Sequence, residues 1–198
     1  MKRLPTDSTQ RKKTEKESPK KTAPKPTKPD KNPMLTPKIR KVTVNICVGK
    51  SGAPLEKAIT VLKDLTNQKP VRLKAKKTIR NFDIRKGESI ACKVTLRKKK
   101  AHEFLTKVLQ ATDGRLPQRH FDQFGNFSFG VKEHIEIPGT KYVPELGIFG
   151  MDVSVTLSRA GYRVKERKRA RSKIGSRQCL TLNEAVAFVK NEIGAEVI

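Results

Sequence analysis

The sequence predicts an α+β domain with a mostly antiparallel sheet, helices on one face of that sheet, and an open basic face on the other. Five segments alternate apolar and polar residues with a period of two, which is typical of strands with one buried face. Three further segments repeat apolar residues at helical spacing. The connection between the second and third strands has hairpin length, which requires antiparallel pairing there. We therefore expect the helices to cover the apolar face.

The predicted strands span residues 41–48, 71–76, 90–97, 126–132 and 151–158. The side chains expected to face the core share an apolar character: Val42, Val44, Ile46, Val48, Val71, Leu73, Ala75, Ile90, Cys92, Val94, Leu96, Phe127, Phe129, Val131, Met151, Val153, Val155 and Leu157. Those expected on the opposite face are mostly polar: Lys41, Thr43, Asn45, Cys47, Arg72, Lys74, Lys76, Ala91, Lys93, Thr95, Arg97, Asn126, Ser128, Lys132, Asp152, Ser154, Thr156 and Ser158.

The predicted helices cover residues 54–66, 99–112 and 182–193. The last has the clearest boundaries, because Thr181 and Glu184 form a capping box before it and Gly194 ends it. The apolar stripes are Leu55, Ala58, Ile59, Leu62 and Leu65 in the first helix, Ala101, Phe104, Leu105, Val108 and Leu109 in the second, and Leu182, Val186, Val189 and Ile193 in the third.

Residues 1–33 differ in composition from the rest of the chain. They contain 6 of the 12 prolines, no aromatic residue, and 11 Lys or Arg against 4 Asp or Glu, with Leu4 as their one large aliphatic residue. Such a stretch cannot bury a core, so we expect a disordered basic arm rich in proline and lysine. Residues 34–198 are expected to form a single domain.

The charge of the chain indicates a polyanionic partner. Its 198 residues include 45 Lys or Arg against 19 Asp or Glu, for a net charge of +26. A membrane surface is the rival polyanion, but no apolar run approaches the roughly 18 residues of a spanning helix and no signal segment opens the chain. Nucleic acid is therefore favoured over a membrane.

The sequence indicates neither a metal site nor a catalytic site. The residues considered for such sites are Cys47, Cys92, Cys179, His102, His120 and His134. The cysteines lack zinc-site spacing, and we expect reduced, mostly buried thiols in a cytoplasmic protein. The histidines are scattered, and none lies near a Gly-flanked serine or an acidic pair. No cofactor is implied.

The polar sheet face is the candidate nucleic-acid surface. It carries Thr, Asn, Ser, Lys and Arg, with Asp152 almost its only acid. Any half-exposed antiparallel sheet alternates in this way, so the pattern alone is ambiguous. The basic side chains favour a polyanion, because like charges on neighbouring strands repel unless something neutralises them. These side chains are Arg72, Lys74, Lys76, Lys93 and Arg97.

Two basic loops are further candidates for contact. The loop 77–87 is longer than a hairpin requires, and its side chains could hold phosphates while an aromatic ring lies on a sugar or base. Its candidate residues are Lys77, Thr78, Arg80, Asn81, Phe82, Arg85 and Lys86. Alternatively, Phe82 and Ile84 fold back onto the core. The segment 161–177 carries 8 Lys or Arg against the single acid Glu166, and it either binds phosphate or remains a solvated loop.

Six blocks in one order resemble a known family. They are Asn32-Pro33-Met34, KVTVNICVG (41–49) followed by Ser51-Gly52, LTNQKPVRLKAKKTIRNFDIRKGE (65–88), CKVTLR (92–97), GNFSFGVKEHIEIPG (125–139) and KYVPELGIFGMDVSVTL (141–157). The chain is similar to the universal large-subunit ribosomal protein five family, whose eukaryotic members are called protein eleven. The basic segment and extra helix after residue 160 resemble archaeal or eukaryotic members.

The resemblance implies a structural protein of the large ribosomal subunit, located on cytoplasmic ribosomes, and not an enzyme. The implied partners are 5S ribosomal RNA, large-subunit ribosomal RNA, the neighbouring ribosomal proteins of the central protuberance, and peptidyl-site transfer RNA at the loop 77–87. The RNA-facing residues carried over are Asn45, Gln68, Lys69, Lys93 and Thr95. The pattern of the strands adds Arg72, Lys74, Lys76, Arg97 and Asn126.

Two residues depart from the family pattern. Asn67 stands where the family usually has glycine, and we expect the turn to survive because Asn tolerates a left-handed backbone. Lys98 replaces the glycine that usually follows Thr-Leu-Arg, which alters the expected entry into the second helix.

Two other functions compete with this interpretation. A general nucleic-acid chaperone or chromatin-like protein would account for the charge, although a shaped sheet face favours structured RNA. An RNA-modifying enzyme would need a nucleotide or methyl-donor loop, and the stretch from Gly147 to Gly150 is too short and too apolar to hold phosphate.

Overall fold

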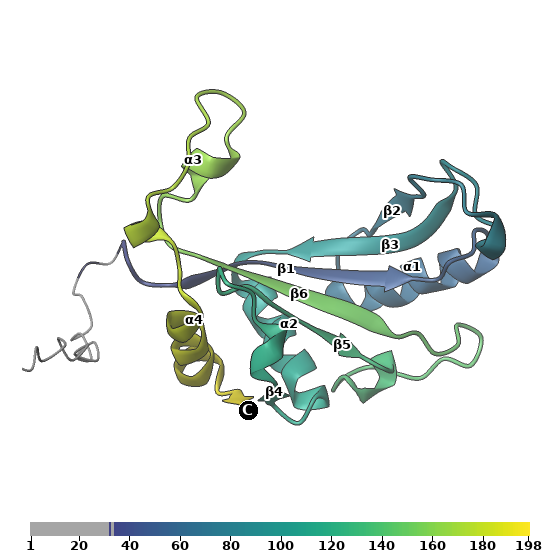
Figure 1. The fold of residues 1–198 in the computed structure, drawn as a ribbon. Helices are drawn as coiled ribbons and strands as arrows, with labels where there is room; N and C mark the ends of the chain where they lie inside the picture. The colour runs from purple at the N-terminus through teal and green to yellow at the C-terminus, as the bar shows by residue number, and fades with distance from the viewer. Residues whose placement is uncertain (1–31, 33) are drawn as a thin grey trace, which may run out of the picture. The chain divides into compact units, whose positions relative to one another are not determined.

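A computed structural model describes Asn32 and residues 34–198. The predicted arm over 1–33 otherwise lies outside the described residues. The main sheet has five strands in the order β2-β3-β1-β6-β5, and every neighbouring pair is antiparallel (Figure 1). Its strands are β1 (Lys38–Cys47), β2 (Val71–Lys74), β3 (Ser89–Leu96), β5 (Phe127–Val131) and β6 (Met151–Ser158). The α+β prediction with a mostly antiparallel sheet is confirmed.

Three of the four α-helices among the described residues follow the predicted periodicity, and α3 (Arg163–Glu166), in the basic segment, was not predicted. The helices are α1 (Ala53–Thr66), α2 (Lys98–Ala111), the short α3 and α4 (Leu182–Phe188). A π-helical turn, Val189–Ile193, continues α4 to Gly194, whose left-handed φ of 74° ends it as predicted. The capping box of Thr181 and Glu184 is present. Short 3₁₀ turns occur at Arg80–Phe82, Gln118–His120, His134–Glu136 and Ser176–Gln178.

The core lies between the apolar sheet face and the helices. Val42, Val44 and Ile46 of β1 are almost completely buried and cluster with the buried stripes of α1, α2 and α4. All five residues predicted for the α2 stripe are buried. Burial of apolar surface stabilises the fold by about 25 cal/mol per Å² removed from water, which makes this layer the main source of stability. Among the described residues, no helix is both long enough and apolar enough to cross a bilayer.

The sequence did not indicate the small second sheet. In it, β4 (Arg115–Leu116) pairs in parallel with β7 (Glu196–Val197). Figure 1 shows α4 and β7 at the end of the main sheet where β1 begins and β6 ends. Strands of two residues carry no detectable period, so only the tertiary structure defines them.

The facing predicted for Val71, Arg72 and Leu73 of β2 is wrong, whereas a register shift between Leu73 and Lys74 keeps Lys74 on the predicted open face. The register of β2 pairs Val71 with Lys93 and Arg72 with Cys92, so Arg72 lies on the helix-covered face and Val71 on the open face, 59% exposed. The Arg72 guanidinium reaches Glu56 of α1 at 2.7 Å. A shift of one residue in strand pairing moves the shifted side chains, here Val71, Arg72 and Leu73, to the other face of the sheet. This edge strand has only four residues and one neighbour, so two apolar side chains provide too little burial to set its register.

Asn67 and Lys98, the two residues that depart from the family pattern, both have a left-handed backbone conformation. Asn67 ends α1 with φ 49° and ψ 37°, and its N–H donates to the carbonyl of Lys63 at 2.8 Å, so the predicted turn is confirmed. Lys98 has φ 56° at the start of α2. A residue with a Cβ is strained there by about 1–2 kcal/mol, which explains why glycine suits this position.

Candidate nucleic-acid interface

The open face of the sheet is organised in rows that run across the strands. One row joins Lys93, Asn45 and Asp152 on β3, β1 and β6, because Asn45 pairs with both of the others. The next row joins Thr95, Thr43, Ser154 and Ser128 through the same pairings. Directly paired residues project to the same side of an antiparallel sheet. The face therefore presents amide, hydroxyl and lysine groups, with Asp152 as the one acid in these rows and the exposed Val71 beside Lys93 at the β2 edge.

The predicted residues of this face fall into three groups. Asn45, Lys93 and Thr95 are half-buried in the middle of the sheet, where their neighbours hold them. Lys74, Lys76 and Arg97 are exposed near the strand ends. In the turn before β2, Gln68 is half-buried and Lys69 is exposed. Asn126 is half-buried just before β5, and its Nδ2 donates to Asp122 Oδ2 at 3.0 Å. Arg72 does not belong to this face.

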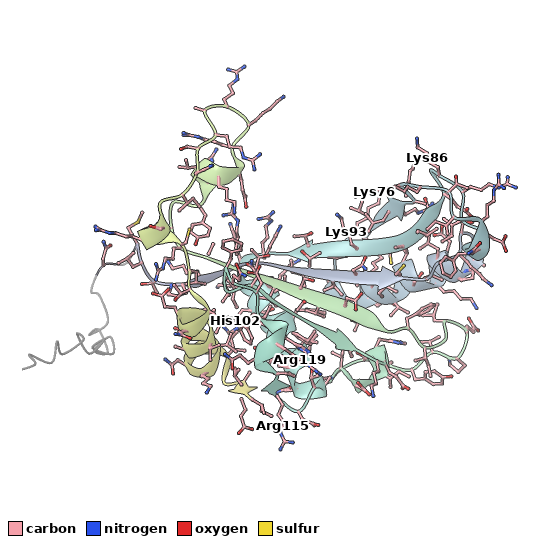
Figure 2. All side chains as sticks on the ribbon, viewed as in Figure 1. Lys76, Lys86, Lys93, His102, Arg115 and Arg119 are labelled. Carbon is pink, nitrogen blue, oxygen red and sulfur yellow. The ribbon has the colours of Figure 1, made fainter. Side chains whose placement is uncertain are left out.

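The loop 77–87 is an ordered tip. Ile79 and Ile84 exchange two backbone hydrogen bonds of 2.9 and 3.1 Å, and the 3₁₀ turn between them leaves Phe82 70% exposed. The alternative in which Phe82 folds back onto the core is therefore wrong. Ile84 is only half-buried. Figure 2 shows Lys76 and Lys86 at this end of the molecule, with Lys93 further along β3, and Arg115 far from the tip.

A carboxylate fixes the base of this tip. Glu88 accepts hydrogen bonds from the Ser51 hydroxyl and from the N–H of Arg85, the latter at 3.1 Å. The Ser51 hydrogen bond and then the Arg85 hydrogen bond lower the pKa of the Glu88 carboxyl. Glu88 therefore remains an anion that holds the tip at neutral pH.

The basic segment 161–177 projects from the opposite end of the sheet and stands clear of it (Figure 1). Its ends are joined by side chains that the sequence analysis missed. Arg159 is buried, and it donates to Arg177 O at 3.1 Å, Cys179 O at 3.4 Å and Glu184 Oε1 at 2.6 Å. Tyr162, near the start of the segment, also contacts the residue that follows its end, since the Tyr162 hydroxyl donates to Gln178 O at 3.2 Å.

The buried titratable groups have structural roles. His134 is 3% exposed, and its Nδ1 accepts the N–H of Phe149 at 3.3 Å. Burial lowers the pKa of His134, so its neutral form is favoured. Burial raises the pKa of the Cys92 thiol to about 11. The prediction of mostly buried thiols holds for Cys92 but not for Cys47, which is exposed because it ends β1 on the open face. Within the described part of the chain, no three His, Cys, Asp or Glu side chains gather as a metal site would require.

Comparisons with known proteins identify the family. Residues 32–85 match the family model described as ribosomal protein L5, and residues 89–187 match that of the ribosomal L5P family C-terminus. The large ribosomal subunit protein uL5 of Sulfurisphaera tokodaii is 50% identical over 168 residues, which cover 84% of this chain and 95% of the relative. The uL5 of Pyrobaculum aerophilum is 51% identical over 166 residues, covering 84% and 93%. The uL5 of Methanococcus maripaludis is 49% identical over 172 residues, covering 85% and 95%.

The chain belongs to the ribosomal L5 family. This confirms the resemblance, with archaeal relatives in keeping with the predicted archaeal or eukaryotic type, and the prediction that the chain is a ribosomal protein and not an enzyme. The two L5 matches meet at the base of the tip, just before β3. The second match spans the basic segment 161–177.

Proposed function

We propose that this protein is a structural component of the large ribosomal subunit that binds 5S ribosomal RNA and large-subunit ribosomal RNA through the open face of its sheet. The ribosomal proteins of the central protuberance are its neighbours, on ribosomes of the cytoplasm. The tip at 77–87 contacts peptidyl-site transfer RNA. Binding alone accounts for this function, and no turnover is required.

The observation that carries the proposal is the row structure of the open face. Folded RNA is recognised largely through its phosphates, its 2′-hydroxyls and its shape. Lys93 supplies charge for phosphate, while Asn45 and Thr95 supply short polar groups that can reach a ribose. These three residues are held on adjacent strands, so little side-chain freedom is lost when RNA binds.

The family supports this choice of partner. The relatives are named as proteins of the large ribosomal subunit, and the net charge of +26 suits a ribosomal RNA environment. A general nucleic-acid chaperone would need the charge but not the ordered rows.

A salt series distinguishes the two functions. We expect the protein to bind 5S ribosomal RNA more tightly than an unrelated hairpin at every salt concentration. Both affinities should fall steeply, by about a thousandfold between roughly 50 and 200 mM salt if several phosphates are neutralised. Identical curves for the two RNAs would contradict the proposal and favour a general chaperone.

Shortening the tip tests the transfer RNA contact separately. Replacing residues 77–87 with an Asn-Gly turn should keep β2 and β3 paired, because such a turn matches the twist of antiparallel strands. We expect the variant to enter large subunits at normal occupancy, while its ribosomes retain peptidyl-site transfer RNA less firmly. Loss of incorporation would make the tip part of the docking surface, and unchanged retention would remove its transfer RNA role.

A further inference from the structure

A hollow of about 640 Å³ opens beside the foot of the basic segment. Thr156 of β6, Asn126 before β5 and Lys165 of α3 are among the residues that line it. Its volume falls within the range of about 300–1,000 Å³ found for small-ligand pockets. This hollow is remote from the tip and adjoins the end of the open face.

The charges around the hollow favour an anion. Lys165, Arg171 and Lys173 line it and form no ion pair among the described residues. The single acid of the lining, Glu166, is already paired with the Arg40 guanidinium. An entering phosphate would therefore meet three available cations and no free carboxylate.

An exposed aromatic ring lies in the same hollow. Phe124 is 58% exposed although the core lies close by, and the Lys165 ammonium is 5.5 Å from its ring centroid. The backbone fixes its position, because the Phe124 N–H donates to Asp122 and Gly125 packs against α4. The Tyr162 ring is a second fixed wall, since its hydroxyl also accepts the N–H of Leu180 at 2.9 Å.

We propose that this hollow receives one unstacked nucleotide of the bound RNA. The base lies on the Phe124 ring, and its phosphate lies among Lys165, Arg171 and Lys173. Every base has a π face, so stacking of this kind is tolerant of sequence. A phosphopeptide would satisfy the cations but would leave the exposed ring without a flat partner. The inference rests on the proposed function, since it assumes that RNA is the ligand of the open face.

Two RNA probes test the site with the full-length protein. One is a hairpin with a loop of unpaired uridines, and the other is its stem closed as a blunt duplex with no unpaired nucleotide. Stacking on one aromatic side chain contributes about 1–3 kcal/mol, so we expect Phe124→Ala to weaken hairpin binding about 5- to 150-fold and leave duplex binding unchanged. Phe124→Tyr, which keeps an aromatic ring, should bind the hairpin about as tightly as the wild type does. Tyr142→Ala is the matched control, because Tyr142 is a 54% exposed aromatic residue outside the hollow.

The outcomes separate this site from the proposed function. If the wild-type protein does not bind 5S ribosomal RNA at moderate salt, the proposed function fails. If it binds 5S ribosomal RNA but not the hairpin probe, only the nucleotide site is overturned. If it binds the hairpin but Phe124→Ala has no effect, only the nucleotide site is overturned. A phosphoserine peptide whose binding depends on Phe124, with no such dependence for the hairpin, would assign the hollow to a protein partner instead. Cross-linking of a 4-thiouridine loop to the peptide containing Phe124, lost in Phe124→Ala, would support the nucleotide site.

Discussion

The two basic extensions of the sheet are held in different ways. The tip at 77–87 is organised locally, by the backbone pair of Ile79 and Ile84 and by Glu88 at its base. The segment 161–177 is organised from a distance, by Arg159 before it and by contacts to residues after it. Both present dense positive charge. The tip therefore depends mainly on its own loop, with Ser51 holding Glu88 at its base, and the basic segment depends on the packing of the C-terminal helix.

This difference predicts different sensitivities to mutation. A change in the packing of α4 should loosen the basic segment and leave the tip intact. A change at Glu88 should loosen the tip and leave the basic segment intact.

Gly125→Ala should have the largest effect on the free energy of unfolding. A Cβ at this position would lie 2.8 Å from the Ala185 Cβ and 2.9 Å from the Leu180 Cδ2, and the φ of 76° is itself unfavourable for alanine. Overpacking and backbone strain together should lower the free energy of unfolding by about 3 kcal/mol. Urea unfolding measures the loss. Gly147→Ala, with φ 81° and open space around its Cβ, is the control and should lose only about 1 kcal/mol.

Arg159→Ala should have an intermediate effect. The Arg159 side chain is 7% exposed, and its removal leaves the carbonyls of Arg177 and Cys179 and the Oε1 of Glu184 without this donor. We expect a loss of about 2 kcal/mol, because Glu184 is partly exposed and regains water. Amide hydrogen exchange should accelerate in 161–179 but not in 77–87. Arg163→Ala, at an exposed arginine nearby, is the control, and equal acceleration in both extensions would contradict separate support.

Glu88→Gln should have the smallest effect, confined to the tip. Because its pKa is lowered, the contribution of Glu88 is complete above the usual carboxyl value of 4.5 and is lost as the pH falls through the lowered pKa. In the wild-type protein the chemical shift of the Arg85 amide should change as Glu88 titrates. In the variant this pH-dependent change should be absent. The Thr181 amide, which donates to Glu184 at 3.0 Å, should titrate in both proteins. A tip transition that persists in the variant would show that another group holds it.

The parts predicted from the sequence are those that local pattern determines. The alternation in β1 and the α2 stripe have many buried members, so their facing was unambiguous. Arg72 was misplaced because a four-residue edge strand takes its register from backbone pairing and Glu56. Arg159 and Phe124 were missed because neither belongs to a helical or strand period. Their partners lie far along the chain or in a hollow that only folding creates.

The most direct test of the open face compares two faces of neighbouring strands. Lys93→Ala with Thr95→Ala removes two side chains of the open face, while Arg72→Ala removes a similar charge from the helix-covered face. With affinity for 5S ribosomal RNA measured per folded molecule at moderate salt, we predict that the double variant binds about 2 kcal/mol, or roughly thirtyfold, more weakly with an unchanged thermal melt. Arg72→Ala should bind almost as the wild type does. Unchanged affinity in the double variant, together with a sharply lowered melting temperature or a large loss of affinity in Arg72→Ala, would contradict the assignment of RNA binding to this face.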